Sequence, residues 1–259
     1  MNQLTVLGGA AAGIGTGQGC SGYLIDIDDT TFVLDLGPST LIELRKHTDF
    51  RTLDAIVISH MHMDHVLDLF ILRFMMKYNP VRLVHRIPVY LPPGGLEFMA
   101  KAANLWATEP GEEENYFTEV FEMSEYDPSE TLAIGPATIT FAATVHVIPC
   151  WAMRIHAPGG QDLVYTADTG SDADLDTFAN GAAVIIADSA SAESAPEEVK
   201  RSVHYDAAAA AGLAQRAGAQ HLVLSHQWEE LDPMANAAIA RETFLGRISI
   251  GQPGLTVTW

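Results

Sequence analysis

Short apolar runs bounded by glycine, proline or aspartate recur along the chain, and each has the length of a buried strand. Asp28-Asp29 lies between two of these runs and predicts a hairpin turn. The predicted strands occupy residues 4–7, 23–25, 31–34, 55–58, 88–91, 118–123, 131–134, 137–145, 151–155, 163–167, 183–187 and 221–224. Segments with apolar residues at helical spacing follow several of the strands. They predict helices at 40–46, 65–78, 96–103, 207–217 and 233–244.

The order of these elements predicts an α/β fold. Strands dominate the first part of the chain, and strands alternate with helices later, which indicates sheets covered by helices. The chain has 259 residues, of which 48% are hydrophobic, so it can bury a large core. Because no Pro/Gly/Ser-rich linker and no short repeat divides the sequence, we predict a single domain spanning residues 1–259.

Composition narrows the classes of partner. Two cysteines, Cys20 and Cys150, are too few for a disulfide framework. The sequence shows neither a signal peptide nor an apolar run of membrane-spanning length, so we expect a cytoplasmic protein without a membrane partner. The formal net charge of −19 argues against long nucleic acids, whose phosphates are usually neutralised by a basic patch. A small-molecule substrate is the expected partner.

The run His60-Met61-His62-Met63-Asp64-His65 places three imidazoles and a carboxylate within six residues, directly after the predicted strand at 55–58. Such a concentration of polar side chains at one strand end has no use in packing, since each buried polar group needs a partner. Imidazole and carboxylate ligands together suit zinc and similar divalent ions. The run therefore predicts a metal site.

Further candidate ligands follow other predicted strands. His146 follows the strand at 137–145, Asp168 follows 163–167, and His226 lies just after 221–224. A lone histidine is more often structural than functional, but the repeated placement of a ligand after a strand favours one common site. Together with the first run, these residues supply seven ligands, which is enough for two ions.

This order of motifs resembles the metallo-β-lactamase superfamily of hydrolases over essentially the whole chain. The turn Leu34-Asp35-Leu36-Gly37 resembles the family's aspartate turn. The resemblance implies an αββα four-layer sandwich, in which two mixed β-sheets are flanked by helices and the metals lie at one edge. It also implies two divalent ions, with zinc expected and manganese or iron as alternatives, and a hydroxide between them that attacks the substrate. Homodimers occur among such proteins, so a second copy of the chain is a further expected partner.

The resemblance assigns roles position by position. Asp168 would bridge the two ions, Asp35 would orient ligands without binding an ion, and Asp64 would also hold or relay the proton of the attacking water. The first ion would bind His60, His62 and His146. The second ion would bind Asp64, His65 and His226.

An aspartate at the bridging position, in place of the cysteine of zinc β-lactamases, resembles ribonuclease Z-like phosphodiesterases, glyoxalase II-type thioesterases and lactonases. His204 favours the first of these, because ribonuclease Z-like members carry a histidine in a similar place that assists the leaving group. The residues after it, Tyr205-Asp206, depart from the small or hydroxyl residues expected there. The alternative interpretation is that His204 caps or flanks the helix at 207–217.

The leading hypothesis is hydrolysis of a small phosphodiester in ribonuclease Z-like fashion. The alternative is hydrolysis of a carbon ester, thioester, lactone or β-lactam at the same two-ion site, and a third hypothesis is a non-hydrolytic sensor. Processing of tRNA is not favoured, since residues 66–145 lack a glycine-rich basic arm. The aromatic and methionine residues of that segment, from Phe70 to Phe117, are expected mainly in the core. The glycine-rich segment 13–19 lacks the lysine of a phosphate-binding loop and is expected near the metal rim.

Overall fold

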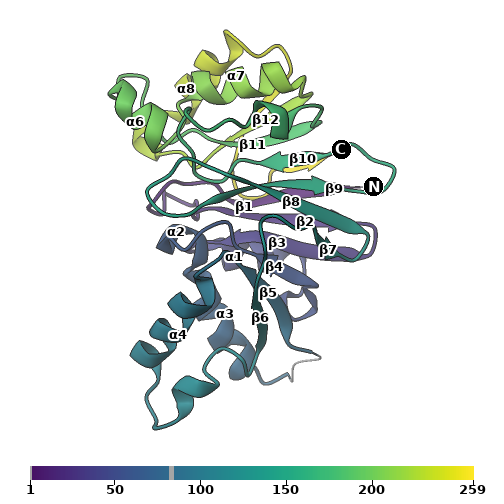
Figure 1. The fold of residues 1–259 in the computed structure, drawn as a ribbon, viewed down its shortest axis with the longest axis vertical. Helices are drawn as coiled ribbons and strands as arrows, with labels where there is room; N and C mark the ends of the chain where they lie inside the picture. The colour runs from purple at the N-terminus through teal and green to yellow at the C-terminus, as the bar shows by residue number, and fades with distance from the viewer. Residues whose placement is uncertain (1, 82–84) are drawn as a thin grey trace.

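The protein is described by a computed structural model covering residues 2–81 and 85–259, so that residues 1 and 82–84 of the predicted domain lie outside the described part. Two mixed sheets pack face to face and helices cover their outer faces, as Figure 1 shows. The predicted four-layer α/β sandwich is confirmed.

The first sheet combines an antiparallel and a parallel half. Strands β14, β1, β2 and β3 pair antiparallel, and β3, β4, β5 and β6 continue the sheet in parallel. In sheet order the strands are β14 (Thr256–Thr258), β1 (Gln3–Gly8), β2 (Gly22–Ile27), β3 (Thr30–Leu36), β4 (Ala55–Val57), β5 (Ile87–Leu91) and β6 (Phe121–Glu125).

The second sheet has the same mixed character. Strands β10 to β13 are parallel, and β7, β8 and β9 extend the sheet in antiparallel pairs. In sheet order the strands are β13 (Arg247–Ile250), β12 (His221–Ser225), β11 (Val184–Asp188), β10 (Leu163–Tyr165), β9 (Trp151–His156), β8 (Ala137–Ala143) and β7 (Leu132–Ile134).

Helices form the two outer layers. The first sheet is covered by α1 (Thr40–His47), α2 (Met63–Val66), α3 (Asp68–Lys77) and α4 (Gly95–Trp106), and the second by α5 (Asp176–Ala179), α7 (Ala207–Ala217) and α8 (Pro233–Arg241). A further short helix, α6 (Glu197–Ser202), precedes α7. Single 3-10 turns occupy η1 (Phe50–Thr52), η2 (Glu112–Glu114) and η3 (Glu229–Leu231).

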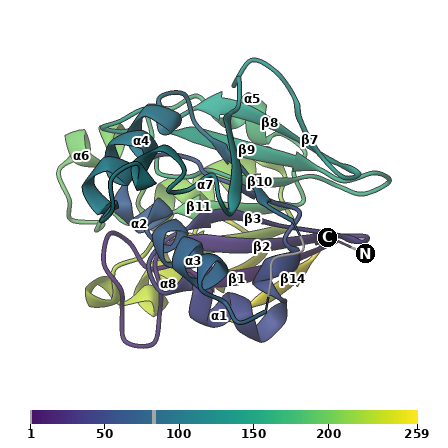
Figure 2. The same ribbon diagram turned by 90° about the horizontal axis from the view of Figure 1, so that it is seen from below.

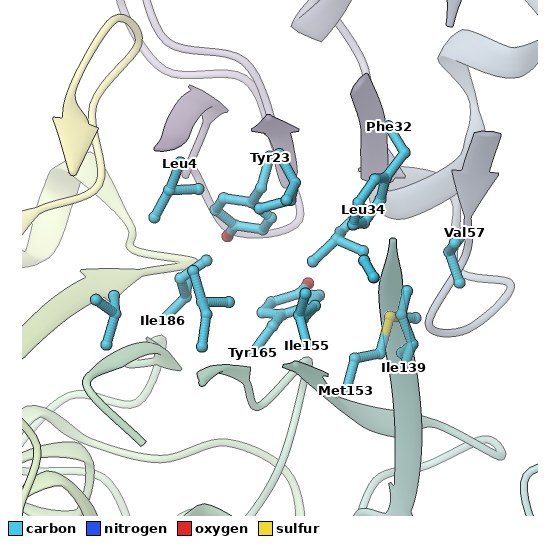
Figure 3. Packing of buried hydrophobic residues seen from close by; sticks show 14 of the residues in the cluster. Leu4, Tyr23, Phe32, Leu34, Val57, Ile139, Met153, Ile155, Tyr165 and Ile186 are labelled. Carbon is cyan, nitrogen blue, oxygen red and sulfur yellow. The ribbon is translucent and has the colours of Figure 1, made fainter. Parts of the chain in front are cut away.

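Alternation along the strands builds the core. On β2, Tyr23 and Ile25 point between the sheets, whereas Leu24 points to the helices over the first sheet. Because both faces are covered, these strands read as almost continuous apolar runs. Figure 3 shows the layer between the sheets, where Tyr23 of β2 lies opposite Tyr165 of β10.

Several sequence predictions need correction. The predicted helix at 65–78 begins at Met63 and is interrupted at Leu67. Beside the interruption, Asp68 accepts a hydrogen bond from the backbone N–H of Leu41 on α1, a tertiary contact that local periodicity does not reveal. The strand predicted at 118–123 starts at Phe121, because residues 115–120 form turns. Strands β13 and β14 and helices α5 and α6 were not predicted.

The predicted core position of the aromatic segment is confirmed only in part. Tyr116 and Phe117 are buried, but Phe74 is 47% and Trp106 is 55% exposed. Both chain termini lie at one end of the sandwich, and α2 lies at the opposite end in both views (Figures 1 and 2). Within the described residues, no helix is long and apolar enough to cross a membrane.

Candidate metal centre

One end of the sandwich collects polar side chains from both sheets. The segments that follow β4, β8, β10 and β12 carry the predicted ligands, and the carboxyl ends of parallel strands meet at the same edge of a sheet. The structure brings all seven predicted ligands together in two clusters that share Asp168.

The first cluster joins His60, His62 and His146 with Asp168, and their ligand atoms all lie within 4.8 Å of one another. His62 Nδ1 lies 3.1 Å from Nε2 of His60 and 3.1 Å from Nε2 of His146. Burial lowers the pKa of His62 and His146, and holds the pKa of His60 well below its ordinary value. Neutral imidazoles therefore present nitrogen lone pairs to a common point.

The second cluster joins Asp64, His65 and His226 with Asp168, again within 4.8 Å. His226 Nε2 lies 3.1 Å from Asp64 Oδ2, and His65 Nε2 lies 3.2 Å from Asp168 Oδ1. Burial opposes protonation of both histidines, but the surrounding carboxylates together outweigh it: Asp168, Asp188 and Asp64 raise the pKa of His226 to about 10, and Asp168 with Asp35 raises that of His65 well above its ordinary value. The buried carboxylates of Asp64 and Asp168 are therefore stabilised by positive charge placed next to them.

Hydrogen bonds on the outer side of the imidazoles fix which nitrogen points inward. His65 Nδ1 lies 2.8 Å from Asp35 Oδ2, His146 Nδ1 3.1 Å from the carbonyl oxygen of Val203, and His226 Nδ1 3.3 Å from Asp188 Oδ1. Each outer nitrogen donates to its acceptor, so Nε2 is the nitrogen available to an ion. Asp35 is fully buried and contacts His65 on the side away from the cluster, as expected for the orienting group that the family resemblance implies.

These residues fit two divalent cations. Among the described residues, His65 Nε2 and Asp168 Oδ1 are buried atoms without a hydrogen-bond partner, although they lie 3.2 Å apart. A cation between such atoms would satisfy a nitrogen lone pair and a carboxylate oxygen at once. Imidazole nitrogens with carboxylate oxygens are a donor set for zinc and similar borderline ions.

The backbone at the site is held in an unusual conformation. Asp35, Ala167 and His226 have φ values of 54°, 51° and 54°, in the left-handed region that costs about 1–2 kcal/mol per non-glycine residue. Each of these residues is, or directly precedes, a group of the site. Such strain persists only where surrounding contacts over-determine it, as the hydrogen bonds to Asp35 and His226 do here.

Two glycines allow the segments of the site to approach closely. A Cβ atom on Gly37 would overlap the backbone carbonyl oxygen of Asp64, and one on Gly170 would overlap the carbonyl group of Arg201. The first contact seats the metal-binding run against the turn after β3. The second seats the end of α6, and the segment leading to His204, against the loop after Asp168.

His204 lies beside both clusters, with its ring centroid 5.1 Å from that of His146 and 5.1 Å from that of His226. Its Nδ1 donates to Oδ2 of Asp188 at 2.8 Å. Burial opposes protonation of His204, but Asp188 raises its pKa above the ordinary value. The alternative capping role is wrong, because Asp206 caps α7 by accepting a hydrogen bond from the backbone N–H of Ala209.

Sequence reasoning missed Asp188. It ends the buried strand β11 and accepts hydrogen bonds from the backbone N–H groups of Thr169 and Ala190 as well as from the two histidines. Because both of its oxygens are already engaged, we interpret it as an orienting group rather than an ion ligand, although it lies within a third grouping of potential ligands. The signal was available, since Asp188 directly follows the apolar strand predicted at 183–187, much as His226 lies just after the one predicted at 221–224.

The remaining predictions about the site surroundings are also resolved. Ala10, at the start of the glycine-rich loop, pairs with Gln227, so this loop lies beside the segment that carries His226. A cavity of about 590 Å³ is lined by residues 13–18 together with Gln227 and Trp228, but by none of the seven predicted ligands. Four further histidines, which have no motif in the sequence, make contacts away from the two clusters, namely His47, His85, His156 and His221.

Comparison with known proteins agrees with this geometry. A model of the beta-lactamase superfamily domain matches residues 30–227. A protein named probable metallo-hydrolase YhfI of Bacillus subtilis is 29% identical over 226 residues, covering 86% of each chain. Ribonuclease Z of Methanopyrus kandleri is 25% identical over 260 residues, again covering 86% of each chain.

The solved structures agree as well. The crystal structure of YhfI from Bacillus subtilis superposes with a TM-score of 0.86 and 26% identity, covering 99% of this chain and 98% of that one. The family model alone spans more than half of the sequence. The chain therefore belongs to the metallo-β-lactamase superfamily of hydrolases.

Proposed function

We propose that the protein is a metal-dependent hydrolase that cleaves a small phosphodiester. The observation that carries the proposal is the hydrogen bond between His204 and Asp188 beside the two ligand clusters. Hydrolysis of a phosphodiester expels an alkoxide, which needs a proton, and a histidine next to the ions can supply it.

The residues would divide the work between them. His60, His62 and His146 would hold one ion, and Asp64, His65 and His226 the other, with Asp168 shared. When bound, the two ions would supply the charge that acidifies a water held between them and polarises a phosphoryl oxygen.

His204 is arranged to act as the general acid. Asp188 accepts from Nδ1, which leaves the Nε2–H as the donor, and the same carboxylate favours the protonated imidazolium. The imidazole is partly exposed, with 22% of its side chain accessible, so a substrate group can reach it. These features support a role in protonating the leaving oxygen.

Asp64 is arranged to receive a proton on the other side of the reaction. Its Oδ2 atom faces His226 Nε2, and 12% of the side chain is accessible. Because its histidine partners hold the pKa of Asp64 below the ordinary value despite burial, the carboxylate is ionised at neutral pH. It can therefore orient an attacking water and accept its proton transiently.

The similarity to ribonuclease Z favours a phosphodiester as the bond that is cleaved. The name of that relative denotes cleavage of RNA, whose backbone is a phosphodiester, and the match covers most of this chain. The lack of a basic arm and the net charge of −19 favour a small substrate over a folded RNA.

The test is turnover of bis(p-nitrophenyl) phosphate by zinc-loaded protein, measured beside thioester and lactone substrates. Phosphodiester cleavage is expected to dominate. His204→Ala is expected to slow a diester with an alkyl leaving group more than one with p-nitrophenolate, which leaves without a proton. His156→Ala, which changes an exposed histidine away from the site, is the matched control. Absence of phosphodiester turnover together with brisk thioester or lactone hydrolysis would reject the proposal.

The acidic balance of the chain favours a second candidate. A surface of net charge −19 does not attract anionic substrates, whereas a neutral carbon ester, thioester or lactone is indifferent to it. The same substrate panel decides between the two, because both reactions use the same ions and differ in the pocket and in the demand for His204.

Asp64→Asn separates any hydrolase from a sensor that only binds. An enzyme is expected to lose most of its turnover, since the amide cannot accept the proton. A sensor would keep its ligand affinity and would show no turnover to lose.

A further inference from the structure

The Asp35 carboxylate, between the metal-binding run and the second sheet, receives an unusual number of hydrogen bonds. Its Oδ1 accepts from the backbone N–H of Ser59 at 2.7 Å. Its Oδ2 accepts from Ser59 Oγ at 2.7 Å, from the Tyr165 hydroxyl at 2.7 Å and from His65 Nδ1 at 2.8 Å. All four groups are buried, so none of these bonds can be exchanged for water.

The hydroxyl of Ser59 has a single proton, and the contact with Asp35 uses it. His60 Nδ1 lies 3.0 Å from the same Ser59 oxygen. Since the hydroxyl has no second proton to donate, the imidazole must donate through Nδ1–H. His60 is then fixed in the tautomer whose Nε2 lone pair points into the first cluster.

One carboxylate therefore reaches both clusters by two routes. It contacts His65 of the second cluster directly, and it reaches His60 of the first cluster through Ser59. Tyr165 comes from the second sheet (Figure 3), and its hydroxyl ties this carboxylate of the first sheet to the second.

We propose that Ser59 is a positioning residue that sets the tautomer of His60 and thereby the affinity of the first cluster for its ion. Tyr165 completes the arrangement by fixing Asp35, on which both clusters depend. The inference rests on the metal-binding part of the proposed function and not on the reaction that the ions support.

The chain offers a matched control for each residue. Ser225 also directly precedes a predicted ligand histidine, His226, and is equally buried, but its hydroxyl pairs with the Tyr23 hydroxyl at 2.7 Å. Tyr23 is likewise a buried tyrosine whose ring centroid lies 4.8 Å from that of Tyr165, yet its hydroxyl pairs with Ser225 rather than with Asp35.

The first measurement is the tautomer of His60 in metal-free protein carrying ¹⁵N-labelled histidine, read from nitrogen shifts and couplings by NMR. Wild-type protein and Ser225→Ala are expected to show His60 protonated at Nδ1. Ser59→Ala is expected to lose that signature, because the acceptor is gone. Persistence of the Nδ1–H tautomer in folded Ser59→Ala would overturn the inference.

The second measurement is titration of each metal-free protein with Zn²⁺, followed by calorimetry. A parallel titration with Co²⁺ is followed by the absorption spectrum of the bound ion. Ser59→Ala is expected to lower the affinity of one of the two sites for its ion about 10–100-fold and to leave the affinity of the other near the wild-type value. Tyr165→Phe is expected to lower the affinity for both ions. Ser225→Ala and Tyr23→Phe should leave both affinities unchanged. Equal losses in Ser59→Ala and Ser225→Ala would also overturn the inference.

These readouts separate the inference from the proposed reaction. Protein that binds two zinc ions and shows the predicted tautomer, but cleaves no phosphodiester, would refute the reaction and leave the role of Ser59 standing. Protein that cleaves phosphodiesters with unchanged rate and zinc affinity after Ser59→Ala would refute the role of Ser59 alone.

Discussion

Replacing Asp188 by asparagine tests how one buried carboxylate serves both the ligands and the leaving group. Oδ1 accepts from Ala190 N–H and His226 Nδ1, and Oδ2 accepts from Thr169 N–H and His204 Nδ1. An amide has one acceptor oxygen, and its NH₂ group can only donate. Whichever way the asparagine is oriented, two of the four donors lose their acceptor, and all of these donors except the partly exposed His204 are buried.

The magnitude follows from this count. Each buried donor left without a partner costs about 1–3 kcal/mol, so the variant is expected to lose about 2–6 kcal/mol of unfolding free energy. Loss of general-acid assistance by His204 is expected to lower turnover of a diester with an alkyl leaving group about 10²–10⁴-fold.

The pH dependence of turnover provides a second, independent test of the role of Asp188. Asp188 raises the pKa of His204 in the folded protein, so the protonated acid persists to higher pH than for an ordinary histidine. Activity falls as pH rises through that pKa. Without the carboxylate the pKa decreases, and the alkaline limb of the pH–rate profile is expected to move to lower pH.

The assay combines urea unfolding with pH–rate profiles for zinc-loaded wild type and variant, using alkyl and p-nitrophenyl leaving groups. Asp162→Asn is the matched control, because Asp162 also accepts from a histidine, His156 Nδ1 at 2.7 Å, but precedes β10 at the end away from Asp168. The reasoning is refuted if Asp188→Asn keeps the wild-type alkaline limb, or if both leaving groups slow by the same factor.

Three further outcomes are expected. Gly37→Ala should displace the metal-binding run, because the new Cβ would overlap the Asp64 carbonyl oxygen, and a shift of about 1 Å can cost about 10²-fold in turnover, measurable by steady-state kinetics. Arg73→Met should cost about 1–3 kcal/mol in urea unfolding and expose residues 107–120 to protease, since Arg73 donates to the Tyr116 carbonyl at 2.7 Å and to Glu112 at 3.0 Å, and the carbonyl would lose its buried partner; unchanged proteolysis would contradict this anchoring role. Removal of metal by a chelator should lower Tm, and zinc should restore it in a concentration-dependent way, because ions that bind only the folded chain stabilise it by mass action; a Tm that does not respond to zinc would contradict the two-ion site.

Much of the site could be read from the sequence because its ligands follow apolar strands. Strand β12 is a continuous buried run that ends immediately before His226, and the run after β4 carries four candidate ligands in six residues. These patterns are local, and local patterns are what a single sequence displays.

Other features depend on residues far apart in the chain. Strand β14 lies near the C-terminus but pairs with β1 at the N-terminus, and β13 exists as the parallel neighbour of β12. Short edge strands of this kind carry little periodicity of their own, since their stability comes from the partner strand.

The sequence by itself indicated sheets covered by helices and seven candidate ligands, because hydrophobic periodicity and strand-end chemistry are written in neighbouring residues, and its resemblance to the metallo-β-lactamase superfamily implied the two-sheet sandwich. Only the tertiary structure decided that Asp188 accepts hydrogen bonds from both His204 and His226, and that the Ser59 hydroxyl lies between Asp35 and His60, within hydrogen-bond distance of each. The physical reason is that a hydrogen bond is set by distance and direction between atoms, which the folded chain fixes and the order of residues does not.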